Sequence, residues 1–257
     1  MAELAESKSK TGYPDGLPKK SRGIWSDSRR FLLRRPAIPT LIDSSSETAR
    51  EKYSQRIKQR LGVSVKDYAI LNIHRIGIEA PAAYVFEQLV EWNEMGRCWP
   101  GHIAKLERIE GSLEHIDVLL FGRRKPLLGL KSTLFGLNVA PLFKMEAIKL
   151  QQTPSPSDLD NARYVLYKCR GGYPIGIFCP YVRSSIGQEG ETEATQVFMV
   201  VGFNFYGRKD WPRTHLINRV WELIHNRVTA NVLNRFKRLC EVRMQDGTAG
   251  RQVLSDG

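Results

Sequence analysis

Residues 68–90 read YAILNIHRIGIEAPAAYVFEQLV, and the architecture of the domain follows from them. The first half, Tyr68 to Ile78, is β-branched and partly alternating, which predicts a strand. Pro81 then suits the first turn of a helix, where its missing N–H has no bond to lose. Apolar residues follow at helical spacing as far as Trp92. The sequence therefore predicts a strand followed directly by a helix.

Further along, the chain breaks into six short runs of strand character, separated by turn-forming residues. The segment from Arg123 to Pro141 reads either as a loop over the sheet or as a distorted strand, and Pro180 indicates an edge or a bulge in its strand. Short links between sequential strands predict antiparallel pairing in a meander. The six runs are Ile103–Glu110, His115–Phe121, Phe143–Gln152, Ala162–Arg170, Ile175–Ile186 and Thr195–Tyr206.

A long amphipathic helix is predicted from about Thr214 to Met244, because apolar residues recur there at steps of three or four. About 30 residues at 1.5 Å each span roughly 45 Å, more than any of the predicted strands. Such a helix can lie across the whole concave face of a curved sheet. The last strand offers it one apolar face, formed by Val197, Met199, Val201, Phe203 and Phe205.

The segment Ile78–Phe86, with the sequence IEAPAAYVF, precedes Trp92 and the link Cys98-Trp99-Pro100-Gly101. Together with the terminal helix, these residues resemble the START-like (SRPBCC) superfamily, which includes polyketide cyclase/aromatase-like proteins and lipid-transfer domains. The resemblance implies an α+β helix-grip fold, in which a curved antiparallel sheet wraps around the long C-terminal helix and encloses a central apolar cavity. Residues 65–243 are expected to form this domain.

The flanking residues carry most of the positive charge. Residues 1–66 contain 15 Lys and Arg against 7 Asp and Glu, so they hold +8 of the net charge of +12. Residues 1–60 are expected to be a basic, largely disordered tail with a short helix over 46–61, and 244–257 a disordered C-terminal tail. Such an arm is expected to be a solvated linker, or to make a weak contact with anionic membranes through Arg29, Arg30, Arg34 and Arg35. Docking to RNA is the other alternative, and no specific nucleic-acid partner is expected.

Signals of covalent or metal chemistry are weak in this sequence. The four cysteines form no C-x-x-C pair, which argues against a zinc knuckle or redox motif and favours a reduced protein. The histidines lack metal-binding spacing, and no nucleotide-binding or nucleophile-elbow pattern is present. No apolar run has the length of a signal peptide or a membrane span. We therefore expect a cytoplasmic protein with no metal, no cofactor and no catalytic residue.

The expected function is non-covalent binding or transport of a hydrophobic small molecule, such as a lipid, isoprenoid, quinone or polyketide-like compound. Burying ~300 Å² of apolar ligand surface supplies about 7 kcal/mol before binding costs, which is enough for micromolar affinity. The apolar residues among the candidate ligand-binding residues are equally consistent with ordinary core packing, and Arg183 is also consistent with a solvent-facing position. The candidate ligand-binding residues are Trp99, Tyr181, Arg183, Met199, Phe203, Asn204, Trp221, Ile224 and Val228.

An enzyme is the alternative function. A cyclase, dehydratase or aromatase would fold and deprotonate a bound polyketide-like chain with a few polar residues such as Tyr181, Arg183 or His102. This chemistry requires at least two polar side chains that converge in the pocket with perturbed proton affinity.

Overall fold

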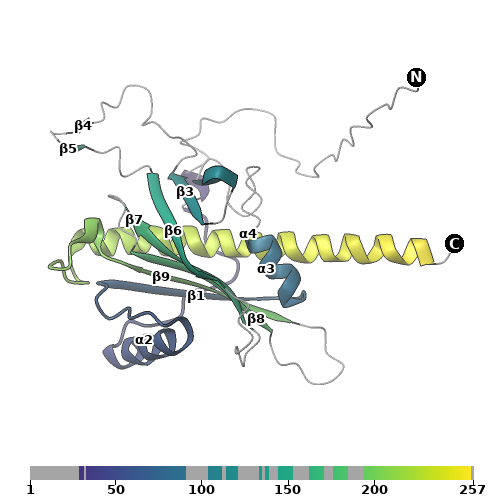
Figure 1. The fold of residues 1–257 in the computed structure, drawn as a ribbon, viewed down its shortest axis with the longest axis horizontal. Helices are drawn as coiled ribbons and strands as arrows, with labels where there is room; N and C mark the ends of the chain where they lie inside the picture. Colours follow the sequence, from purple (N-terminus) through teal and green to yellow (C-terminus); the bar gives the residue numbers. More distant parts are fainter. Residues whose placement is uncertain are drawn as a thin grey trace.

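A computed structural model shows seven antiparallel strands that curve around a long terminal helix (Figure 1). The structure describes residues 29–31, 33–90, 104–111, 114–120, 133–134, 137–138, 144–152, 162–170, 176–184 and 194–255. The strand order is β1-β9-β8-β7-β6-β3-β2. Every neighbouring pair is antiparallel, and the first and last strands lie side by side. The expected α+β helix-grip architecture is therefore confirmed.

All seven predicted strands are present in this sheet. A separate pair, β4 (Thr133–Leu134) and β5 (Leu137–Asn138), lies within the stretch that the sequence left open, and the rest of that stretch is outside the described residues. Two short 3₁₀ turns are Ile109–Gly111 and Phe205–Gly207. The strands of the large sheet are β1 Ile70–Ile78, β2 Ala104–Arg108, β3 His115–Leu120, β6 Lys144–Gln152, β7 Arg163–Arg170, β8 Ile177–Ser184 and β9 Thr195–Phe203.

The helices α2 (Glu47–Leu61), α3 (Ala82–Val90) and α4 (Leu216–Ser255) accompany the sheet. The expected disordered tail from residue 244 is instead helical as far as Ser255. Figure 1 shows this part of α4 extending past the end of the sheet, where a helix needs no apolar face. The apolar periodicity that predicts the helix therefore stops before the helix does. Among the described residues, no helix is both long enough and apolar enough to cross a bilayer.

Pro180 lies in β8, which is inside the sheet between β7 and β9, so the edge position indicated by its residue type is wrong. The pairing of β7 with β8 runs through Tyr164–Tyr181 and Tyr167–Phe178 and is interrupted between these two pairs, next to Pro180. Proline has no N–H to donate to a neighbouring strand. The interruption of the β7–β8 ladder accommodates the missing donor.

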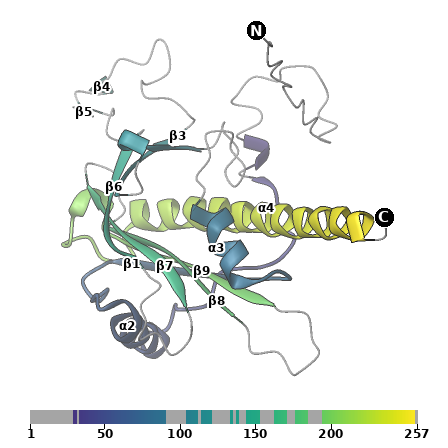
Figure 2. The same cartoon turned by 45° about the vertical axis from the view of Figure 1, so that its right-hand side comes forward.

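Both faces of the central strands are buried, by different layers (Figures 1 and 2). In β1, Ile70, Ile76 and Ile78 join the inner core with α3 and α4, whereas Leu71 and Ile73 join the outer core with α2. Because successive side chains of a strand point to opposite faces, the two parity classes of β1 feed two separate cores. The sheet is therefore the middle layer of three.

Residues 40–60, which the sequence assigns to the N-terminal tail, form part of this outer layer. The N–H of Ile42 donates to the carbonyl of Ile73 at 2.8 Å, so the segment runs alongside β1. Next, α2 covers the outer face of the sheet and buries Ile57 and Leu61. This part of the expected tail packs as a component of the folded unit.

The position of α2 is secured at both ends of the helix. Ser46 Oγ accepts a hydrogen bond from the N–H of Ala49 at 3.2 Å, and Gly62 ends the helix with a φ of 71°. We expect Ser46→Ala to lower the free energy of unfolding by about 1 kcal/mol, because an N–H of the first turn loses its acceptor. Urea denaturation measures this change. Thr48→Ala, at an exposed position in the first turn, is the matched control and should be neutral or slightly stabilising; equal losses in both variants would contradict the cap.

Candidate functional site

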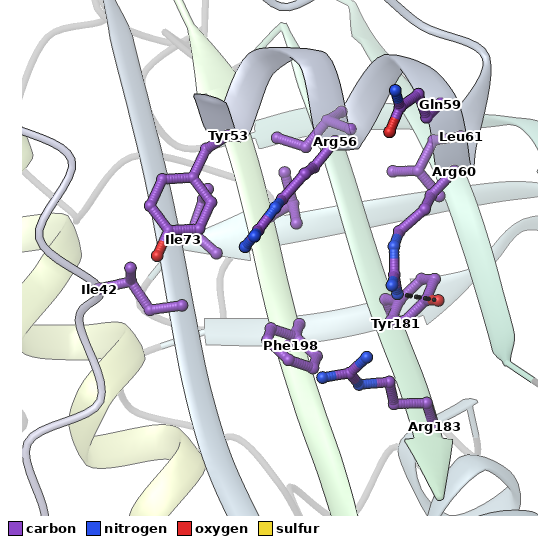
Figure 3. Close-up of a pocket in the computed structure, with 12 residues that line it drawn as sticks. Ile42, Tyr53, Arg56, Gln59, Arg60, Leu61, Ile73, Tyr181, Arg183 and Phe198 are labelled. Atoms are coloured by element: carbon purple, nitrogen blue, oxygen red, sulfur yellow. Dashed lines mark hydrogen bonds between the residues drawn. The ribbon is translucent and has the colours of Figure 1, made fainter. Parts of the chain in front are cut away.

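A pocket of about 410 Å³ lies between α2 and the outer face of the sheet (Figure 3). We call it the α2 pocket. Helix α2 contributes its roof, and strands β1, β8 and β9 contribute its floor. This volume is within the range of small-molecule sites in proteins. Its lining residues are Ile42, Tyr53, Arg56, Ile57, Gln59, Arg60, Leu61, Ile73, Tyr181, Arg183, Phe198 and Val200.

The floor of the α2 pocket is apolar. Ile73 comes from β1, and Phe198 and Val200 come from β9, where they alternate with residues that point into the inner core. From the roof, Ile57 and Leu61 add the apolar stripe of α2. A ligand that covers these side chains removes their apolar surface, and its own, from water.

The rim of the α2 pocket is cationic, and each of its cations lies against an aromatic ring. The guanidinium carbons are 5.8, 5.9 and 5.3 Å from the centroids of their rings, for Arg56 over Tyr53, Arg60 over Tyr181 and Arg183 over Phe198 respectively. Arg60 Nη1 also donates a hydrogen bond to Tyr181 Oη at 2.9 Å. Contacts between guanidinium groups and ring faces are attractive and fix the plane of the cation.

The described lining residues carry an unbalanced charge. Three of these twelve are arginines and none is acidic, so together they carry a formal charge of +3. In Figure 3, the side chains of Arg56 and Arg60 reach from α2 toward the sheet, and Arg183 extends from β8 across Phe198. Cations from two elements that are far apart in the sequence therefore meet above one apolar floor.

The sequence-predicted site residues divide between the two faces of the sheet. Tyr181 and Arg183 line the α2 pocket, and Arg183 is half-buried rather than solvent-facing. Met199 and Phe203 point the other way, into the inner core, with exposed fractions of 3% and 0%. Trp99 lies outside the described residues, as do Trp92 and His102. The structure therefore does not bring the predicted set together into one site.

The remaining predicted residues lie elsewhere in the fold. Asn204 clamps the chain before β1, since its Oδ1 accepts from the N–H of Ala69 at 2.7 Å and its Nδ2 donates to the carbonyl of Asp67. Trp221 packs on the inner core, Val228 is half-buried, and Ile224 is 41% exposed. Between α4 and the sheet lie fully buried side chains such as Phe203, Leu233 and Phe236.

Two histidines lie in this inner layer. His74 is fully buried and is hydrogen-bonded to Thr40 Oγ1 at 2.9 Å and to Asn226 Oδ1 at 3.1 Å. An amide oxygen only accepts, so Nε2 carries the proton and the Thr40 hydroxyl donates to Nδ1. Burial lowers the pKa of His74 to about 4. Burial, with the nearby His74, lowers the pKa of His225 to about 3. Neutral His74 thus ties the N-terminal segment to α4.

The four arginines expected to contact a membrane are exposed. The chain beside them is docked on α4, because Asn231 Nδ2 donates to the carbonyls of Phe31 and Arg34. Asn234 holds Ile38 in the same way, through both its N–H and its carbonyl. This basic segment therefore lies against its own domain. Its members are Arg29, Arg30, Arg34 and Arg35.

Sequence reasoning missed ten of the twelve lining residues of the α2 pocket, among them Arg56 and Arg60. A signal for them was present, since they are four residues apart and flank the apolar stripe formed by Tyr53, Ile57 and Leu61. Residues four apart share one face of a helix. The two arginines therefore point in the same direction as the apolar stripe, whichever surface the stripe packs against.

No protein-family model matches the sequence, and no curated protein matches it either. Several solved structures are similar in fold. The Zhui aromatase/cyclase from Streptomyces sp. R1128 has a TM-score of 0.41 and 15% identity, over 68% of this chain and 95% of that chain. Norcoclaurine synthase from Thalictrum flavum has a TM-score of 0.37 and 12% identity, over 66% and 85%. A conserved protein from Geobacillus kaustophilus has a TM-score of 0.40 and 14% identity, over 66% and 95%.

These likenesses concern the fold, and the ligand chemistry of this chain follows from its own side chains. Fold and pocket together define a helix-grip protein with a pocket of about 410 Å³ on the outer face of its sheet.

Proposed function

We propose that the protein reversibly binds a small molecule with an apolar body in the α2 pocket, without covalent chemistry. The observation that carries this proposal is a pocket of about 410 Å³ whose floor is formed by Ile73, Phe198 and Val200. Burying ~300 Å² of apolar ligand surface there supplies about 7 kcal/mol before the costs of association. Binding in the micromolar range needs little more than that.

The residue types in the lining favour binding over catalysis. None of the twelve lining residues is His, Cys, Ser, Lys, Asp or Glu, which are the side chains that most often act as nucleophile, acid or base. Two described lining residues, Tyr53 and Tyr181, carry a proton on oxygen, and the oxygen of Tyr181 accepts a hydrogen bond from Arg60. A cyclase mechanism that needs two converging proton-transfer groups has less support here than simple binding.

The test is binding of Nile red, a neutral fluorescent dye. We expect a blue-shifted emission and a dissociation constant in the micromolar range. Phe198→Ala should weaken binding roughly tenfold, because the dye loses an aromatic contact surface on the pocket floor. Titration of the dye with protein, followed by its emission, measures both values.

Ile224→Ala is the matched control, since it removes an apolar side chain from α4, on the other side of the sheet. It should leave the dissociation constant unchanged. The proposal would be wrong if Nile red does not bind, or if Phe198→Ala and Ile224→Ala weaken binding equally.

A further inference from the structure

We propose that α4 docks on membranes that contain anionic lipids, with its outward apolar face in the headgroup region and neighbouring arginines against the lipid headgroups. This face is distinct from the α2 pocket, because α2 and α4 cover opposite faces of the sheet (Figures 1 and 2). The inference therefore goes beyond the proposed function and does not depend on it.

The outward face of α4 begins with an apolar stripe, which we call the α4 stripe. Its members recur at steps of three and four residues, so they share one side of the helix. Their exposed fractions lie between 41% and 73%. A contiguous apolar patch of this kind on a protein surface marks an interaction site. The members of the stripe are Leu216, Ile217, Val220, Leu223 and Ile224.

The basic segment lies on the same side of α4 as the stripe. The steps of three and four residues that join Val220 to Leu223 continue through Arg227 to Asn231 and Asn234. These two asparagines are the residues whose side chains hold the basic segment. The basic segment therefore extends the docking surface along the helix. Its exposed residues include Arg29, Arg30, Leu33, Arg34 and Arg35.

Positive charge predominates along this part of α4. Residues 216–240 include five basic residues and one acidic residue. The acidic residue, Glu222, is half-buried near Arg50 of α2 and, at 100° per residue, points away from the α4 stripe. Arg219, one turn from Leu216, is exposed beside the stripe. On this side of residues 216–240, an anionic surface meets basic residues and no acidic one.

The combination of apolar and basic residues favours a lipid surface over other partners. The interface of a bilayer offers apolar carbon to the leucines and anionic headgroups to the arginines within one layer. A nucleic acid would satisfy the arginines alone, because its phosphates leave the exposed leucines in water. A second copy of the chain would bring arginines against arginines, and like charges repel. A membrane is therefore the occupant that suits both components of the surface.

The experiment is sedimentation of the full chain with vesicles of phosphatidylcholine, with and without one third of phosphatidylserine. We expect roughly tenfold tighter binding to the anionic vesicles, and a preference that falls as salt is added. Leu223→Ala should weaken binding to the anionic vesicles roughly tenfold, because apolar carbon no longer enters the interface. Arg219→Gln should weaken it roughly fivefold, the loss of one cation near an anionic surface.

Two variants on the α2 side of the sheet are the matched controls. Lys52→Gln removes a positive charge from an exposed position on α2, and Phe198→Ala removes an apolar side chain from the pocket floor. Both should bind the anionic vesicles as the wild type does. Leu223 and Arg219 are exposed, so their variants keep the fold, and urea denaturation checks that they do.

The inference is overturned if the protein binds neither kind of vesicle, or binds both equally. It is also overturned if Leu223→Ala binds the anionic vesicles as tightly as the wild type, since the cations would then act without the α4 stripe. Analytical ultracentrifugation without vesicles tests the second copy as occupant. A dimer that Leu223→Ala dissociates, together with unchanged vesicle binding, would assign the stripe to a contact between copies instead.

Discussion

Phe203→Ala will lower the free energy of unfolding by about 3 to 5 kcal/mol and leave binding in the α2 pocket unchanged. Phe203 is completely buried in the inner core, with its ring 5.8 Å from that of His225. Removing the ring leaves a cavity that the surrounding helix and strands cannot fully close. Urea denaturation gives the stability, and Nile red titration gives the binding.

Ile224→Ala provides the comparison, because sequence patterns place Ile224 and Phe203 in the same ligand wall. Ile224 is 41% exposed, so its loss should change stability by no more than about 0.5 kcal/mol. The opposite result for Phe203→Ala, with intact stability and lost binding of the dye, would move the ligand site to the inner face of the sheet.

Acid will destabilise the protein strongly, by roughly 3 kcal/mol between pH 7.5 and pH 5, through His74 and His225. Burial lowers the pKa of His74 to about 4 and, together with His74 itself, that of His225 to about 3, whereas an unfolded histidine has a pKa of 6.5. At pH 7.5 both residues are mostly neutral in both states, so they add little pH dependence there.

Below pH 6.5, His74 and His225 bind protons in the unfolded chain but stay neutral in the folded chain. The loss of stability therefore grows as the pH falls toward the folded pKa values near 4 and 3. At pH 5, His74 contributes about 2 kcal/mol and His225 about 1 kcal/mol, the latter reduced because residue 225 as a whole is only half-buried.

Urea denaturation of the wild type and of His74→Gln, at pH 7.5 and pH 5, isolates the larger contribution. His74→Gln lowers stability at pH 7.5, since the bonds to Thr40 and Asn226 are disturbed, but its further loss at pH 5 should be about 2 kcal/mol smaller than that of the wild type. An identical loss of unfolding free energy in both proteins would show that His74 does not contribute to acid destabilisation.

The strands and the terminal helix were predictable because each presents a regular apolar period. In β9, Val197, Met199, Val201 and Phe203 alternate and point to α4, as predicted. The same strand carries Phe198 on its other face, which joins the pocket floor. Because both faces of these strands are apolar, their alternation does not say which face carries a ligand site.

The location of the pocket depended on α2, which the sequence placed in a charged tail. Its helix was predicted correctly over 46–61, and its apolar stripe was visible as Tyr53, Ile57 and Leu61. What the sequence lacked was the surface to which this stripe docks, because most of that surface is built from β8 and β9, more than a hundred residues away. Tyr181 and Arg183, which the sequence predicts as ligand-binding residues, line a pocket that faces α2 and not α4.

The pairing of the first strand with the last also governs how the chain reaches this fold. Ile70 stands opposite Phe203, so β1 has no neighbour in the large sheet until β9 has been made. During synthesis, the N–H and carbonyl groups of β1 and its two apolar faces stay unpaired until the intervening strands and β9 have been made. Pairing between strands this far apart in the sequence is slow. Nascent chains of this protein are thus most prone to self-association just before β9 leaves the ribosome.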